Sequence, residues 1–192
     1  MEETDMITVR YATLEDIDRL LEIYAYYVEK TAISFEYDVP SKEEFTRRFE
    51  RITAKYPFIA AEKDGKTVGY TYAGDFVGRS AYAWSAELTV YIDKDYLKCG
   101  VGKALYTKLE EDLRAMGITN LYACIGVPSE DDRYLTRNSI DFHEHFGFVQ
   151  IGQFHNCGYK FGNWYDMVWA EKIVGKHTGD MKNIIPFPQL KR

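Results

Sequence analysis

The chain has 192 residues, of which 46% are hydrophobic and 16% aromatic, so it is long enough to bury the core of one globular domain. Its formal net charge of −6 argues against general binding to nucleic acids or anionic membranes, although a local basic loop can still bind a small anion. No apolar run is long enough to cross a bilayer, and the N-terminus lacks a signal-peptide pattern. The three cysteines lack metal-ligand spacing, so we expect a reduced, cytoplasmic protein without a metal.

The first half of the chain predicts two helices and four strands. Thr13 is followed three residues later by Asp16, and Ser41 by Glu44, and both spacings are typical of a capping box at the start of a helix. The turn Asp64–Gly65 between two β-rich segments indicates a hairpin. The expected elements are a strand at 7–11, a helix from Thr13 to Val28, a loop at 31–40, a helix from Ser41 to about Lys55, and strands at 58–62, 67–74 and 85–92.

The second half predicts two further helices, which end at Gly117 and Gly147, the residue type favoured just past a helix C-terminus. The expected elements are a helix at 102–116, a strand at 121–127, a charged stretch from Pro128, a helix at 138–145, and strands at 148–154 and 164–171. This order indicates one α/β (α+β) domain, residues 1–175, with helices packed on a mixed sheet. The tail, residues 176–192, has no periodic pattern, and we expect it to be mobile or to dock onto a partner.

A glycine-containing basic turn joins the strand that ends at Ile92 to the following helix. A helix start exposes unpaired N–H groups and the positive end of the helix dipole, which favours phosphate. Gly100 and Gly102 allow the backbone to approach an anion closely. An ordinary tight strand-to-helix turn would have the same residues. The residues of the candidate anion site are Lys98, Cys99, Gly100, Val101, Gly102 and Lys103.

Short signatures lie in order along residues 7–172. They are Ser34–Phe35, Tyr56–Pro57–Phe58, Tyr72–Ala73–Gly74, Arg79–Ser80–Ala81–Tyr82, Trp84–Ser85–Ala86–Glu87, Thr89–Val90–Tyr91, Leu105–Tyr106, Phe142–His143–Glu144–His145–Phe146–Gly147–Phe148, Gly158–Tyr159–Lys160 and Trp164–Tyr165–Asp166. With these segments the chain resembles the GNAT superfamily of acetyl-CoA-dependent N-acetyltransferases, and within it the phosphinothricin acetyltransferase family. The resemblance implies a GNAT-like fold with a mixed, mostly antiparallel central sheet, acetyl-CoA as cosubstrate, and a homodimer.

The same resemblance implies two catalytic residues, Glu87 and His143, and one backbone donor, Val90, that binds the cosubstrate. Glu87 matches the glutamate that deprotonates the acceptor amine, which is mostly protonated at neutral pH. The Val90 N–H would bind the thioester oxygen, and His143 would protonate the departing thiolate. Each residue also has a structural interpretation: Glu87 as a solvated residue at a strand end, and His143 as a helix residue packed on the sheet.

The resemblance also implies which residues bind acetyl-CoA and the acceptor. The basic turn would hold the CoA pyrophosphate, and Asn138 or Ser139 would reach the pantetheine arm. Cys99 as a covalent nucleophile is disfavoured, because the superfamily transfers the acetyl group directly. On the acceptor side, Arg79 suits a carboxylate or phosphinate, although it also fits a solvated loop. The other acceptor residues are Phe35, which could instead fill the core, Glu36 and Tyr82.

Three positions depart from the family pattern. The basic turn begins with Leu97 where relatives carry Gln or Arg, and Thr136 stands where many relatives carry a CoA-contacting Asn. The segment Glu130–Tyr134 is an insertion rich in acidic residues. These differences affect the rim of the substrate site more than the backbone of the basic turn.

The preferred interpretation is an N-acetyltransferase for a small amino-acid-like amine, of the phosphinothricin or methionine sulfoximine and sulfone type. A polyamine, an aminoglycoside or a protein N-terminus is the alternative acceptor, which the acidic insertion favours and Arg79 opposes. A non-catalytic CoA-binding module is a third possibility, opposed by Glu87 and His143. A dinucleotide-binding domain is excluded, because no Gly-x-Gly-x-x-Gly run follows the first strand.

Overall fold

The computed structural model describes residues 6–190. Residues 1–5, part of the segment without a signal-peptide pattern, lie outside the described residues, as do the last two residues of the tail. The helices are α1 (Ile17–Lys30), α2 (Lys42–Thr53), α3 (Val101–Met116) and α4 (Asn138–His145). The strands are β1 (Thr8–Tyr11), β2 (Phe58–Lys63), β3 (Lys66–Asp75), β4 (Ser85–Ile92), β5 (Asn120–Val127), β6 (Val149–Lys160) and β7 (Asn163–Ile173).

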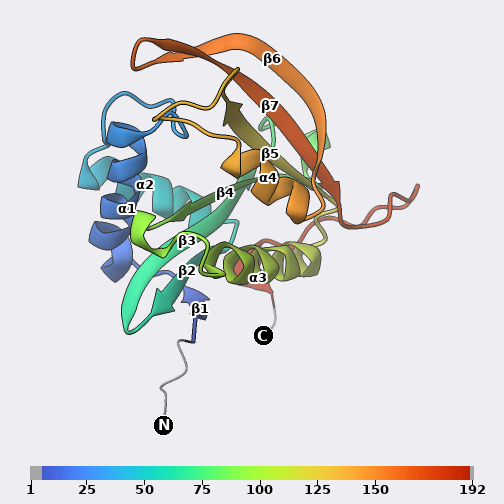
Figure 1. Cartoon of the computed structure of the whole chain (residues 1–192). Coiled ribbons are helices and arrows are strands. Elements are labelled where there is room, and N and C mark those ends of the chain that lie inside the picture. Colours follow the sequence, from blue (N-terminus) through green and yellow to red (C-terminus); the bar gives the residue numbers. More distant parts are fainter. Residues whose placement is uncertain (1–5, 191–192) are drawn as a thin grey trace.

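The strands form one seven-stranded sheet in the order β1-β2-β3-β4-β5-β7-β6. All neighbouring strands are antiparallel except β4 and β5, which are parallel because α3 connects them (Figure 1). The predicted mixed, mostly antiparallel sheet with flanking helices is therefore confirmed. Among the described residues, no helix combines the length and apolar character needed to cross a membrane.

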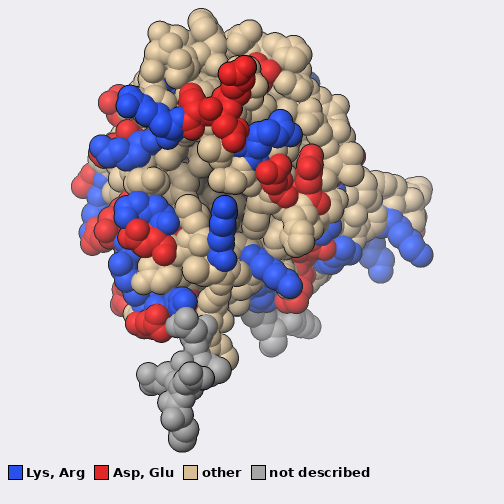
Figure 2. All heavy atoms as spheres, in the orientation of Figure 1, with Lys and Arg blue, Asp and Glu red and all other residues tan. Residues whose placement is uncertain are grey.

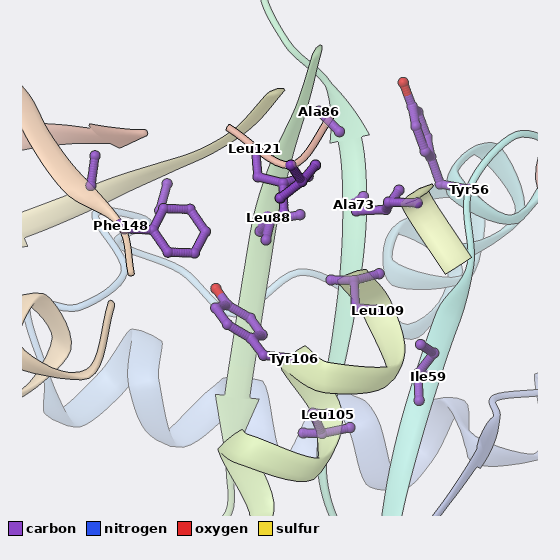
Figure 3. Close-up of a cluster of buried hydrophobic side chains, with 14 of the residues drawn as sticks. Tyr56, Ile59, Ala73, Ala86, Leu88, Leu105, Tyr106, Leu109, Leu121 and Phe148 are labelled. Carbon is purple, nitrogen blue, oxygen red and sulfur yellow. The ribbon is translucent and has the colours of Figure 1, made fainter. Parts of the chain in front are cut away.

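Two hydrophobic clusters cover the two faces of the sheet. One contains the apolar stripe of α3, including Leu105, Tyr106 and Leu109, which point toward the sheet in Figure 3. The other contains α1 and α2 side chains packed on Phe58 and Tyr70. The helices pack this way because their apolar residues recur at helical spacing and form one face. α3 and α4 thus pack on one face of the sheet and α1 and α2 on the other, while most of β6 stays exposed.

The local signals for helix ends are confirmed. The Ser41 hydroxyl accepts a hydrogen bond from the Glu44 N–H, so α2 begins where the capping box predicts. Asp16 accepts from the Thr13 N–H, but this box opens a short 3-10 turn ahead of α1. Gly117 adopts a φ of 92° and ends α3 as expected.

The last hairpin is longer than the sequence predicts. β6 was expected to end at Phe154 but continues to Lys160, and the chain reverses at Phe161 and Gly162, both with positive φ. Polar residues and a glycine at 155–158 resemble a turn, but they form a bulge in which Asn156 has a φ of 48°. The sequence pattern therefore ended this strand six residues too early, while the turn itself lies within the predicted gap between Phe154 and Trp164.

The C-terminal tail packs against the chain itself. Phe187 is buried in the core cluster under α3, and its N–H donates to the Lys55 carbonyl. The N–H of Ile185 donates to Met116, and the Trp84 indole N–H donates to the Lys182 carbonyl. The expectation of a mobile or partner-bound tail is thus replaced by docking on its own domain over these residues, because Phe187 supplies an apolar anchor.

Candidate active site

The parallel strands β4 and β5 separate shortly after they meet. They pair only over Ser85–Glu87 and Asn120–Tyr122, and beyond these residues the two strands diverge. A cleft of about 290 Å³ opens between them. Its lining includes Ile33, Ser34, Phe35, Glu87, Leu88, Thr89, Val90, Tyr91, Tyr106, Cys124, Gly126, Ser139, His143 and Met167. The gap in the sheet therefore brings Glu87, Val90, His143, Ser139 and Phe35 to one cavity.

The backbone of Val90 faces the gap. The Thr71 hydroxyl on β3 donates a 2.7 Å hydrogen bond to the Thr89 carbonyl, which shows that this carbonyl points toward β3. In a trans peptide the carbonyl and the following N–H point in opposite directions. The N–H of Val90 is therefore directed toward the side from which β5 has departed. A donor there can stabilise negative charge on an oxygen inside the cleft.

Glu87 lies on the face of the sheet that carries α1 and α2. Side chains alternate along a strand, so Glu87 shares its face with Tyr91, which packs on the α1 cluster, while Ala86 and Leu88 belong to the α3 cluster. Burial raises the pKa of the Glu87 carboxyl above its ordinary value. A carboxylate with a raised pKa is a stronger base, which suits proton abstraction.

His143 approaches the same cleft from α4, on the opposite face. It is buried, its Nδ1 lies 2.7 Å from the Ser139 carbonyl, and its Nε2 lies 2.9 Å from the Tyr106 hydroxyl. Because a carbonyl only accepts, Nδ1 carries the proton in the neutral ring and Nε2 accepts from Tyr106. Burial lowers the pKa of His143 and raises that of Tyr106, so both groups stay neutral near neutral pH.

The basic turn begins α3 as the sequence predicts, with one difference in the role of its glycines. Gly100 is the N-cap residue with a φ of 87°, a conformation that glycine adopts without strain. Gly102 is buried, and a Cβ there would lie 2.7 Å from the Phe142 ring, so this glycine makes room for α4. Lys98, Cys99 and Lys103 are exposed around the helix start. The N–H groups of the first helical turn and the flanking cations at this end fit a pyrophosphate.

The residues expected to bind the acceptor occupy different positions. Phe35 lines the cleft, whereas Glu36 pairs with Arg48 at 2.7 Å beside a second, smaller cavity of about 110 Å³. Arg79 and Tyr82 are exposed in the connection between β3 and β4, just before the strand that carries Glu87. The cleft lining thus includes Phe35, while Arg79 and Tyr82 lie outside it.

The two residues expected at the pantetheine arm are also separated. Ser139 lines the cleft, and its carbonyl holds the His143 ring, whereas Asn138 is exposed in the first turn of α4. Asp132 of the inserted segment accepts hydrogen bonds from the Tyr134 and Leu135 N–H groups and from the Tyr165 hydroxyl. The Asp132 carboxylate therefore organises its own loop.

The cleft lining also includes residues to which the sequence analysis assigned no role, among them Tyr106, Cys124 and Met167. Tyr106 on α3 contacts His143, whereas in the sequence it stood only within the signature Leu105–Tyr106. Cys124 and Met167 come from β5 and β7, in segments whose residues did not indicate a chemical role. Burial and the neighbouring Glu87 raise the pKa of the Cys124 thiol to about 11, so it is protonated at neutral pH. Among the described residues, no cluster of His, Cys, Asp and Glu is arranged to hold a metal ion.

Comparison with known proteins identifies the family. The GNAT acetyltransferase domain matches residues 9–169. The chain belongs to the GNAT acetyltransferase family. A phosphinothricin N-acetyltransferase from Streptomyces viridochromogenes is 32% identical over 161 residues, which cover 84% of each chain. An L-methionine sulfoximine/L-methionine sulfone acetyltransferase from Salmonella typhimurium is 26% identical and covers 90% of this chain and 97% of its own.

Solved GNAT structures agree with this assignment. The crystal structure of a phosphinothricin acetyltransferase from Sinorhizobium meliloti in complex with acetyl-CoA matches with a TM-score of 0.84 at 29% identity, over 97% of this chain and 99% of that chain. This GNAT protein is therefore an acetyl-CoA-dependent N-acetyltransferase. The start of α3 and the gap beside β4 fit the cosubstrate, because they offer N–H donors, cations and an opening through the sheet.

Proposed function

We propose that this GNAT enzyme transfers an acetyl group to the amine of a small amino-acid-like acceptor of the phosphinothricin or methionine sulfoximine and sulfone type. The observation that carries the proposal is the cleft between β4 and β5. Glu87 reaches it from one face of the sheet and His143 from the other, and the Val90 N–H is directed into it. Such an arrangement suits direct transfer, in which amine and thioester meet inside the gap.

Glu87 acts as the general base in this proposal. The acceptor amine enters from the α1 and α2 face, and its proton moves to the Glu87 carboxylate, directly or through one water. Acetyl-CoA supplies the activated acetyl group when it is bound. A new C–N bond forms, the C–S bond breaks, and the sulfur leaves with its electron pair. The raised pKa of Glu87 supports this role, because it moves the carboxylate closer in basicity to the amine.

The thioester oxygen and the leaving sulfur are served by Val90, Tyr106 and His143. The Val90 N–H holds the carbonyl oxygen as charge develops on it. The leaving sulfur then takes a proton from the pair formed by Tyr106 and His143. In the free enzyme the shared proton lies on the Tyr106 hydroxyl, and the Ser139 carbonyl fixes the opposite nitrogen of the ring. We therefore assign the pair as the acid. Tyr106 carries the proton, and His143 is the hydrogen-bond partner that positions the Tyr106 hydroxyl.

The acceptor class is supported by the relatives and by charge. Related enzymes named for phosphinothricin and methionine sulfoximine use acceptors that carry a carboxylate. Arg79 precedes β4 and is exposed, so it is available to bind such a group as a planar fork. The acidic insertion gives weaker support for a cationic acceptor, because Asp131 and Asp132 already accept hydrogen bonds from their own loop.

The test is CoA-thiol release from acetyl-CoA across a panel of acceptors. The panel contains phosphinothricin, methionine sulfoximine, methionine sulfone, ordinary amino acids, polyamines, an aminoglycoside and an N-terminal peptide. We expect rapid turnover only with the amino-acid-like compounds. Turnover confined to cationic amines or to the peptide would overturn the acceptor class, and tight binding of acetyl-CoA without any turnover would favour a non-catalytic module.

We also propose that the enzyme is a homodimer that works in the cytoplasm. β6 is an edge strand with exposed apolar side chains, including Ile151 and Phe154, and Trp164 is exposed on β7. The upper region in Figure 2, where the β6–β7 hairpin lies, is largely free of charged residues. The three cysteines are free, which supports a reducing compartment. Sedimentation of the wild type and of Ile151→Lys tests the dimer, and a monomeric wild type would overturn it.

A further inference from the structure

The loop of residues 31–36, here called the acceptor loop, forms one wall of the cleft. It follows α1 and carries Ile33, Ser34 and Phe35 into the cleft lining. The end of β6 contacts this loop from more than 120 residues further along the chain. Two β6 residues lie against the loop. Lys160 donates hydrogen bonds to it, and Gly158, which has no side chain, leaves space for it.

Lys160 binds backbone carbonyls at the end of α1 and in the acceptor loop. It is 2% exposed, and its Nζ donates to the carbonyls of Val28 at 2.7 Å, Thr31 at 2.9 Å and Ser34 at 2.6 Å. An ammonium group has three N–H donors, so the three carbonyls use all of them. Val28 and Thr31 lie at the C-terminal end of α1, where the helix dipole stabilises a cation. Lys160 thereby ties the acceptor loop to the helix that precedes it.

Gly158 makes room for the Phe35 ring. A Cβ at Gly158 would lie 2.5, 2.6 and 3.0 Å from three atoms of that ring, which is closer than van der Waals contact allows. A Cβ at Gly126 on β5 would lie 3.4 Å from the same ring. Gly158 has no positive φ, so steric room for Phe35 is the reason for glycine here. The ring is held between two glycine-containing strands.

We propose that Gly158 and Lys160 are specificity-determining positioning residues, which fix the acceptor loop and place the Phe35 ring so that it sets the size of acceptor the cleft admits. This inference rests on the proposed function for the identity of the acceptor. Any movement of Phe35 changes the shape of the cleft, because its ring is part of the wall. Small changes in the volume of an apolar pocket alter substrate preference strongly.

Gly158→Ala is the primary variant, with methionine sulfone and the smaller alanine as acceptors. We expect kcat/KM for methionine sulfone to fall by about tenfold or more, and to fall less for alanine, while the KM for acetyl-CoA stays within about twofold. Gly152→Ala on the same strand is the matched control, because a Cβ at Gly152 meets no atom within 4 Å. Adding Phe35→Leu to Gly158→Ala should restore part of the loss, because leucine vacates the space that the new methyl group needs.

Unchanged acceptor kinetics in Gly158→Ala, or an equal loss for acetyl-CoA and both acceptors, would overturn the specificity role. Lys160→Met provides a readout that does not depend on activity. We expect faster amide hydrogen exchange in residues 31–36 of this variant and unchanged exchange in Gly152→Ala, whereas unchanged exchange in both would overturn the positioning by Lys160. If the wild type rejects every amino-acid-like acceptor, the proposed function fails, while the exchange result still decides whether β6 positions the loop.

Discussion

The two sides of the cleft are built from different kinds of chemical group. On the side of α3, the groups suited to acetyl-CoA are mainly backbone groups: the helix start at Gly100 and the N–H of Val90. On the side of α1, the groups are side chains from separate elements, such as Glu87 and Phe35, and the position of the Phe35 ring depends on packing against β5 and β6. A cosubstrate shared by a family can be bound by backbone geometry, whereas an acceptor that differs between relatives requires side chains.

Glu87→Gln removes the proposed base on the acceptor side without changing its size. We expect kcat to fall by about 100-fold or more, because general base catalysis is lost, while the affinity for acetyl-CoA is unchanged. In the wild type, kcat/KM should decline as pH falls through the raised pKa of Glu87, and the variant should lose this limb of the profile. Stopped-assay kinetics and calorimetric titration measure the two effects. Equal activity of both proteins at every pH would remove Glu87 as the base.

Arg79→Gln tests whether the acceptor side recognises a carboxylate. We expect the KM for an amino-acid acceptor to rise by about 10- to 100-fold, which corresponds to the free energy of a hydrogen bond to a charged group. The KM for acetyl-CoA should be unchanged. The methyl ester of the same amino acid lacks the carboxylate and should be affected little by the substitution. A similar rise in KM for the acid and the ester would contradict a carboxylate-binding role.

Gly100→Val tests the backbone side of the comparison. Valine at a φ of 87° is strained by about 1–2 kcal/mol, and its side chain obstructs the start of α3, so we expect acetyl-CoA affinity to fall by about tenfold. Gly65→Val is the control, because Gly65 has a φ of 73° in the turn between β2 and β3, away from the cleft lining. Calorimetry should show weaker binding for Gly100→Val only. Equal affinity in the two variants would argue against binding at this helix start.

The smallest effect concerns stability rather than activity. The pKa of Glu87 is raised in the folded protein, so its contribution to stability is present below the ordinary glutamate pKa and is lost as pH rises through the raised value. Glu87→Gln should therefore melt at a higher temperature than the wild type near pH 7, and this difference should disappear below the ordinary glutamate pKa. Thermal unfolding at several pH values measures it. A lower melting temperature for the variant near pH 7 would show that the carboxylate stabilises the fold.

Local signals in the amino-acid sequence were enough to predict the ends of several elements. The capping residue Ser41 and the terminal glycine Gly117 fixed helix ends, because they satisfy backbone groups within one turn. The basic turn at the start of α3 was readable for the same reason. The continuation of β6 from residue 155 to Lys160 was missed, because the bulge at Asn156 depends on pairing with β7, which a local pattern does not show.

The meeting of side chains from different elements depends on the three-dimensional fold. Glu87, Tyr106 and His143 are distant in sequence, and the divergence of β4 from β5 brings them to one cleft. Three further contacts are also long-range: the hydrogen bond between Tyr106 and His143, the packing of Phe187 in the core, and the hydrogen bond from Lys160 to the acceptor loop. Such contacts depend on packing between elements rather than on the conformational preference of any single segment, so local sequence patterns contain no record of them.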